Sequence, residues 1–195
     1  MGTEQHESDG NKMGDVTFGP RPTYASDDDF ELAVSSDGKA FTLTFSKLEA
    51  ILDDDQPAVG RVFLLVLPVD SGGCGVDITL AAQGYAITTG GASGYAVMSI
   101  NGQTSMKFFP SRIEDQKYSS SGEGRKCPPS GTEFLKQFPS GTEESFTQVL
   151  RLQAGPTREC HLAVFVLVER SGHPDAGAYL NIDAIDAEIS PRKEG

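Results

Sequence analysis

Short runs in which every second residue is apolar constrain the fold of this chain more than any other feature. In Phe41-Thr42-Leu43-Thr44-Phe45, three large apolar side chains alternate with threonine, which places them on one face of a β-strand. The run from Phe30 to Val34 alternates in the same way, and Ser36-Asp37-Gly38-Lys39 between the two has turn chemistry. The pattern therefore predicts an antiparallel hairpin over residues 30–45.

Further apolar runs predict the rest of a β-sheet protein. Val62–Val69 and Leu162–Val168 are continuous and rich in β-branched residues, which favours central strands covered on both faces. The short run Leu48–Leu52 fits a strand or one helical turn. More strands are expected at 76–88, as one long strand or as two with a kink at Gly84, at 146–152, and at 179–189 with a bulge near Ala184. We expect an all-β, two-sheet antiparallel β-sandwich, jelly-roll or immunoglobulin-like, of about nine or ten strands.

Turn motifs predict a second hairpin and a long loop. Asn101-Gly102 joins the runs Tyr95–Ile100 and Thr104–Phe109, as in a two-residue hairpin turn. Residues 111–145 are rich in Ser, Gly and Pro and predict a long polar loop. The sequence Pro-Ser-Gly-Thr-Glu occurs in it at 129–133 and at 139–143, which suggests two similar turns or helix N-caps.

The composition divides the chain into an arm and a domain. Residues 1–29 are polar, acidic and without periodicity, which predicts a flexible arm. The sandwich domain is expected over 30–190, followed by a tail at 191–195.

The charge excludes several classes of partner. The net charge is −12, and residues 1–60 alone contain thirteen acidic and four basic side chains. Such a surface repels nucleic acids and anionic lipids, so we expect neither nucleic-acid binding nor membrane insertion. The expected partner is another copy of the chain or another protein. The N-terminus is polar and has no apolar stretch that could serve as a signal peptide, which indicates a cytoplasmic protein, or an extracellular one whose leader has been removed.

Motifs of catalysis and metal binding are absent from the sequence, which favours a non-catalytic protein over an enzyme. Cys74, Cys127 and Cys160 are odd in number and match no zinc spacing. The histidines are scattered at positions 6, 161 and 173. No cofactor is expected apart from calcium.

Carboxylates are the abundant chemical groups. Two runs, Asp27-Asp28-Asp29 and Asp53-Asp54-Asp55, flank the first hairpin. If both lie at one end of the sandwich they could share a calcium ion, with Asp183 and Asp186 as a third edge. The alternative is that the acidic runs cap turns and keep the surface soluble.

A resemblance covers residues 30–189. The stretch from Asp37 to Phe45 resembles the opening of a family of small secreted fungal and bacterial β-domains of unknown function. Segments at 82–86, at 160–168 and at 180–186 resemble the later strand motifs of the family and occur in the same order. The resemblance implies a β-sandwich of extracellular origin and no activity. The chain differs from the family in its arm and in lacking a leader and the usual paired cysteines.

Three functions are therefore open. The first is a non-catalytic structural or binding module that self-assembles through its N-terminal arm, by adding a strand to a neighbour's open sheet edge. A calcium-dependent adhesin is a form of this module. The other is a carbohydrate- or ester-active enzyme using loop carboxylates such as Asp183 and Asp186. A sugar site needs an aromatic platform, however, and the chain contains no tryptophan.

Overall fold

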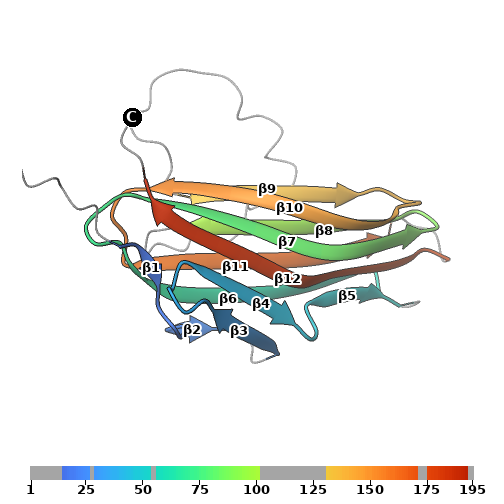
Figure 1. Cartoon of the computed structure of the whole chain (residues 1–195). Coiled ribbons are helices and arrows are strands. Elements are labelled where there is room, and N and C mark those ends of the chain that lie inside the picture. Colours follow the sequence, from blue (N-terminus) through green and yellow to red (C-terminus); the bar gives the residue numbers. More distant parts are fainter. Residues whose placement is uncertain (1–14, 27–28, 54–55, 102–130, 171–174, 193–195) are drawn as a thin grey trace, which may run out of the picture.

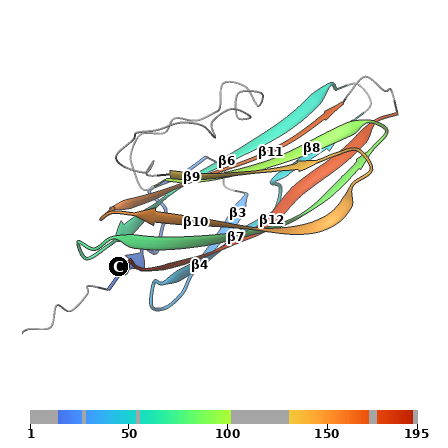
Figure 2. The ribbon, with the colours of Figure 1, turned by 90° about the horizontal axis from the view of Figure 1, so that it is seen from above.

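The chain folds into two antiparallel sheets packed face to face, which confirms the predicted β-sandwich (Figures 1 and 2). The structure is a computed structural model that describes residues 15–26, 29–53, 56–101, 131–170 and 175–192. These residues form twelve strands, slightly more than expected, and none of them forms a helix that could span a membrane.

Each sheet contains six strands. The first has the order β1 (Thr17–Phe18), β6 (Ala58–Asp70), β11 (Glu159–Arg170), β8 (Ala92–Asn101) and β9 (Gly131–Phe138), with β2 (Tyr24–Ala25) also pairing with β6. The second has the order β10 (Glu143–Ala154), β7 (Val76–Thr89), β12 (Gly177–Pro191), β4 (Ala40–Phe45) and β3 (Phe30–Val34), with β5 (Glu49–Leu52) also pairing with β12.

Alternating side chains from the two sheets fill the space between them. Along β7 and β12, buried residues alternate with partly exposed ones for nearly the whole strand. Leu80 and Leu180 of the second sheet are fully buried, as are Leu65 and Leu162 of the first. Burial of each such side chain stabilises the fold by about 1.5–3 kcal/mol.

The first hairpin forms as predicted. β3 pairs with β4, and Gly38 adopts a φ of 69° in the turn between them. The Asp37 carboxylate accepts hydrogen bonds from the Ser35 hydroxyl (2.6 Å) and the Lys39 backbone N–H (3.0 Å). The hydrogen bond from Ser35 is the largest cause of the lowered pKa of Asp37. The run after this hairpin forms a strand, β5, and not a helical turn.

The predicted irregularity in the last strand is also present. The register of β12 against β7 shifts between Ile182 and Ala184, which is a β-bulge. Gly84 lies opposite Ile182 at this point.

The boundary expected between arm and domain is too late in the sequence. Residues 15–26 fall within the expected arm, yet β1 and β2 pair with β6. Val16 and Phe18 are buried, and the Phe18 ring packs edge-on against Phe41 with centroids 4.8 Å apart. Two apolar side chains thus tie this segment to the core. Residues 1–14 lie outside the described part of the chain.

The predicted second hairpin is wrong. β8 pairs with β11 on one side and with β9 on the other, up to Asn101 opposite Gly131. Both edges of β8 are therefore occupied by strands distant in sequence, whereas the run 104–109 lies outside the described residues. An Asn-Gly pair indicates only that a turn is locally favourable, whereas the strands that actually pair with β8 are distant in sequence.

The polar loop predicted at 111–145 is likewise too long, because β9 and the start of β10 lie within it. The second Pro-Ser-Gly-Thr-Glu motif forms the turn between these strands, with Gly141 at a φ of 86°. Thr142 donates from its backbone N–H (3.2 Å) and its hydroxyl (2.6 Å) to the carbonyl oxygen of Pro139. The first motif begins outside the described residues.

The two continuous apolar runs became β6 and β11, neighbours inside the first sheet. Their outward side chains are less covered than predicted, since Phe165 and Leu167 are partly exposed and Val62 is 39% exposed.

Candidate functional site

The eight aspartates predicted to bind calcium are only partly described. Asp27, Asp28, Asp54 and Asp55 lie outside the described residues. Asp29 precedes β3 and forms an ion pair with Lys47 at 3.2 Å. Asp53 follows β5, and its backbone carbonyl accepts a hydrogen bond from Arg170 Nη2 at 2.9 Å.

The structure separates Asp29 from Asp53. The carbonyl oxygen of Asp29 accepts a hydrogen bond from the backbone N–H of Ser46, just after β4. Asp53 comes after Leu52, which pairs with Ala178 near the start of β12. All of β5 lies between the two positions, and its four extended residues alone span roughly 13 Å.

Asp183 and Asp186 lie on β12 and accept hydrogen bonds from side chains of their own sheet. Asp186 accepts from the Thr42 hydroxyl (2.7 Å) and from Gln83 Nε2 (3.1 Å). Asp183 accepts from Asn181 Nδ2 at 2.5 Å. No group of three or more His, Cys, Asp or Glu side chains within the described ranges is placed to hold a metal ion. Calcium binding stays a prediction, since half of its proposed ligands are not described.

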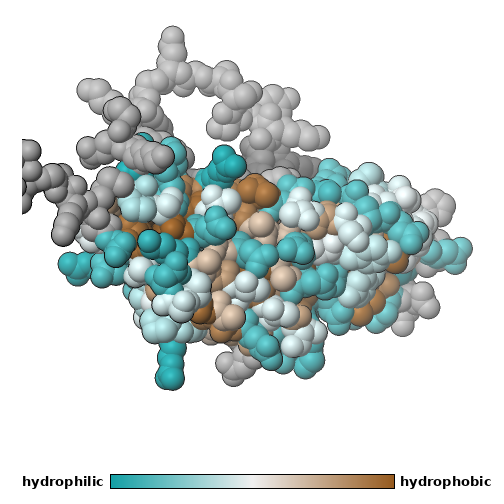
Figure 3. Space-filling view, in the orientation of Figure 1, coloured by the Kyte–Doolittle hydropathy of each residue, from teal (hydrophilic) through white to brown (hydrophobic). Residues whose placement is uncertain are grey.

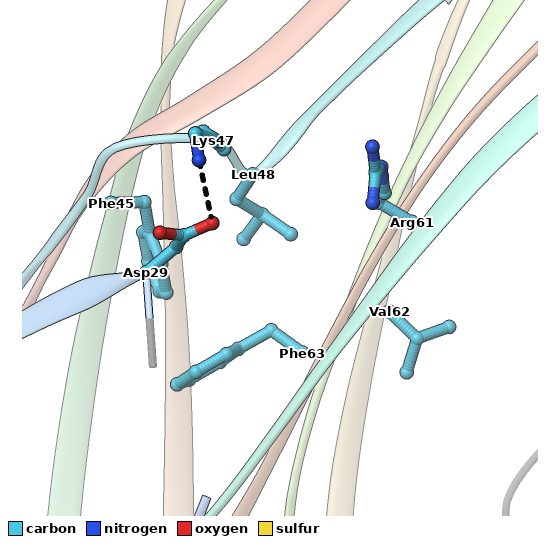
Figure 4. Close-up of a pocket in the computed structure, with 7 residues that line it drawn as sticks. All are labelled: Asp29, Phe45, Lys47, Leu48, Arg61, Val62 and Phe63. Carbon is cyan, nitrogen blue, oxygen red and sulfur yellow. Dashed lines mark ion pairs between the residues drawn. The ribbon is translucent and has the colours of Figure 1, made fainter. Parts of the chain in front are cut away.

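A shallow hollow opens where β4 leads into β5 beside β6 (Figure 4). Its space, including the part open to solvent, is about 280 Å³. Phe45 and Phe63 form part of the wall, with ring centroids 4.8 Å apart. The Asp29–Lys47 ion pair lies at one side, and Arg61 lies across from it. The remaining lining residues are Leu48 and Val62.

A second candidate site is the outer face of the second sheet, where two tyrosines come together. Tyr85 on β7 lies opposite Asn181 on β12, and Tyr179 precedes Asn181 by two residues on the same strand face. The two tyrosines are therefore diagonal neighbours across adjacent strands, with Cβ atoms roughly 7 Å apart. Both are partly exposed, and Ile51, which pairs with Tyr179, is 44% exposed. We call the outer surface around Tyr85, Asn181 and Tyr179 the tyrosine face.

Hydrogen bonds orient the tyrosine face. The Tyr85 hydroxyl donates to Glu143 of β10 at 3.2 Å, and its backbone N–H donates to Asn181 Oδ1 at 2.9 Å. Burial is the largest cause of a raised pKa for Tyr85, followed by the hydrogen bond to Glu143. The pKa of Tyr179 is raised first by burial, then by a hydrogen bond to Glu49 and by the charge of Asp183. Both phenols are thus neutral hydrogen-bonding groups at physiological pH.

The tyrosine face is acidic and polar. Figure 3 views this side of the molecule and shows hydrophilic and hydrophobic residues intermixed, without one continuous apolar patch. Within the described residues, four carboxylates of this face form no ion pair with lysine or arginine: Glu49, Glu143, Asp183 and Asp186. Aromatic rings flanked by unpaired carboxylates and amides suit a ligand rich in hydroxyl groups or positively charged.

Sequence reasoning located Asp183 and Asp186 but missed the tyrosines. Tyr85 and Asn181 are 96 residues apart, and only the register of β7 against β12 brings them together. The sequence pattern that could have revealed them is the alternation of apolar and polar residues, which places both tyrosines on the outward face of their strands.

The histidines and cysteines do not assemble into a site within the described residues. His161 Nε2 lies 3.2 Å from Glu159, and its neighbour Cys160 is buried in the core. Burial raises the pKa of the Cys160 thiol to about 12. His6, His173 and Cys127 fall outside the described residues.

Comparisons with known proteins found no matching family and no matching curated protein. Among solved structures, the chain is similar to one titled "Structure of TmCBM61 in complex with beta-1,4-galactotriose". The identity is 9%, the TM-score is 0.34, and the match covers 92% of this chain and 90% of the other. Similarity at this level assigns neither family nor ligand.

Proposed function

We propose that the protein is a non-catalytic binding module that binds saccharides on the tyrosine face. The observation that carries the proposal is that Tyr85 and Tyr179 are diagonal neighbours on one open sheet face, among carboxylates that have no lysine or arginine partner within the described residues. The two phenol rings supply the aromatic platform that a chain without tryptophan otherwise lacks.

The chemistry of the face fits a saccharide in two ways. A partly exposed tyrosine offers an apolar ring and a polar hydroxyl, which match the C–H face and the hydroxyl groups of a sugar. Hydroxyl groups donate strong hydrogen bonds to carboxylates such as Glu49 and Glu143. Asn181 already uses its Oδ1 and Nδ2 within the sheet, so it holds the face in place more than it contacts ligand.

Charge limits the class of saccharide. Unpaired carboxylates disfavour uronic acids and sulfated sugars, because these ligands would place a second negative charge beside a carboxylate and remove water from both. Neutral saccharides and amino sugars are therefore the expected ligands. Amino sugars should bind more weakly as salt is raised, whereas neutral ones should be little affected.

The proposal is tested with a glycan array probed by the purified protein, followed by calorimetry on the saccharides that bind. Tyr179→Ala should weaken binding at least tenfold, about 1.4 kcal/mol. Tyr24→Ala is the matched control, because Tyr24 is a 51% exposed tyrosine on the other sheet, and its loss should leave affinity unchanged. An array without a bound saccharide, or equal affinities for wild type and Tyr179→Ala, would refute the proposal.

Two further hypotheses stay separate from this one. The self-assembly hypothesis concerns the predicted arm, residues 1–29, of which 1–14 lie outside the described residues, and the calcium hypothesis concerns eight aspartates, of which Asp27, Asp28, Asp54 and Asp55 lie outside them. Deletion of residues 1–14 with measurement of solution mass, and thermal unfolding with and without calcium, test them directly.

A further inference from the structure

β10 has the longest free edge of any edge strand in the described structure. It pairs with β7 at twelve consecutive positions, Glu143 to Ala154, without a register shift, and no described strand pairs with its other side. The edge strands β3, β5 and β9 have five, four and eight residues, and β1 and β2 cover part of the edge of β6. β10 also lacks proline, glycine and lysine, residues that commonly prevent edge strands from pairing.

The odd-numbered residues of β10 direct their backbone groups toward this free edge. The backbone N–H of Thr88 in β7 donates to the carbonyl oxygen of Thr142 at 2.9 Å, so Thr142 faces β7. Because bonding direction alternates along an antiparallel strand, the even-numbered residues face β7 and residues 143, 145, 147, 149, 151 and 153 face outward. The side chains of these six are all exposed.

We infer that β10 is a self-association edge, which pairs antiparallel with β10 of a second copy about a two-fold axis at Thr147. Such an interface is self-complementary, and odd-numbered residues must lie opposite odd-numbered ones to form hydrogen bonds. With Thr147 opposite its own copy, Glu143 of each chain lies opposite Arg151 of the other. Shifting the register by two residues would instead place Glu143 opposite Val149 or Gln153, so charge complementarity selects this register.

The resulting pair would be joined by about ten backbone hydrogen bonds and two cross-strand ion pairs. Val149, which is 52% exposed in one chain, would gain Ser145 of the second copy as its cross-strand neighbour. The inference does not depend on saccharide binding; pairing would place two tyrosine faces on one continuous sheet and would give Glu143, one carboxylate of that face, an arginine partner.

Light scattering after size exclusion, over a series of protein concentrations, tests the inference. The expected mass at high concentration is twice the 20.8 kDa of one chain. Thr147→Pro removes an N–H that faces the free edge and not β7, so it should yield a monomer with an unchanged circular dichroism spectrum. Thr147→Ala keeps this N–H and should remain a dimer.

Charge variants test the register without proline. Arg151→Glu should weaken the dimer because Glu143 then faces a second carboxylate, from the other chain, and adding Glu143→Arg should restore it. A single-chain mass for the wild type at every concentration would overturn the inference, as would a folded Thr147→Pro variant that still dimerises. Failure of the double charge reversal to restore a dimer lost in Arg151→Glu would overturn the register.

Discussion

Gly84 is the residue at which the addition of a single methyl group, as in Gly84→Ala, should most disturb the tyrosine face. It lies on β7 next to Tyr85, opposite the β12 bulge. A Cβ atom at this position would lie 2.7 Å from Cζ of Phe146 and closer still to the carbonyl oxygen of Asn181. The phenyl ring can move by a few tenths of an ångström, but the carbonyl belongs to the sheet backbone and cannot move without disturbing the bulge.

We therefore expect Gly84→Ala to destabilise the protein by about 3 kcal/mol, at the upper end of typical overpacking costs. In a domain of this size, that corresponds to a fall of about 6–12 °C in Tm. Urea denaturation and thermal unfolding, followed by circular dichroism, measure the two quantities.

Gly155→Ala is the matched control for this substitution. A Cβ atom at Gly155 would meet no atom within 4 Å, and its φ is not in the left-handed region. The change should alter stability by no more than about 0.5–1 kcal/mol, in the stabilising direction, through the unfolded chain. If Gly84→Ala unfolds within about 0.5 kcal/mol of the wild type, the argument from close packing at the bulge is wrong.

Three further predictions concern other parts of the sandwich. Lys136→Met should cost about 1 kcal/mol in urea denaturation, since it removes the 2.8 Å ion pair with Glu144 that joins the edges of the two sheets; an unchanged midpoint would contradict this. Cys160 should resist thiol reagents at pH 8 until the protein unfolds, because burial raises its pKa to about 12. Peptide mass spectrometry of the labelled native protein checks this, and modification of Cys160 before unfolding would contradict it. Burial and then a 2.7 Å hydrogen bond to Glu169 raise the pKa of Tyr95 to about 12, so the neutral phenol contributes stability that is present below pH 10 and is lost as the pH rises toward 12. The stability difference between wild type and Tyr95→Phe should shrink over that range, and a difference independent of pH would count against it.

Elements with clear two-residue periodicity could be predicted from sequence. Phe41, Leu43 and Phe45 alternate with threonine, and their hairpin forms with the expected turn. The bulge near Ala184 was also recognisable, because the alternation of the last strand changes phase there.

Pairing between distant segments could not be predicted in the same way. β9 could not be recognised because its short run lies between two turn-like motifs. Its partner β8 also ends at Asn101 of an Asn-Gly pair, which favours a hairpin with the residues that follow directly. The short strands β1 and β2 have too few residues to show a period. Their place follows from tertiary burial of Val16 and Phe18.

The candidate site was the least predictable part. Asp183 and Asp186 were found as carboxylates on one strand, but the shared calcium site required the two aspartate runs to lie at one end of the sandwich, and β5 separates Asp29 from Asp53. The tyrosine face depends on the register between Tyr85 and Asn181, including the bulge beside it. A phase change of one residue would turn Tyr179 into the core and remove the site.

The most direct test of saccharide binding on the tyrosine face is a titration of the ¹⁵N-labelled protein with a saccharide that binds, followed by NMR. Binding on this face should shift the backbone amide signals of Tyr85, Tyr179 and Asn181 most, on the outer face of the second sheet. Shifts concentrated at Lys47 and Arg61 would place the ligand in the hollow between the sheets, and would rule out saccharide binding on the tyrosine face.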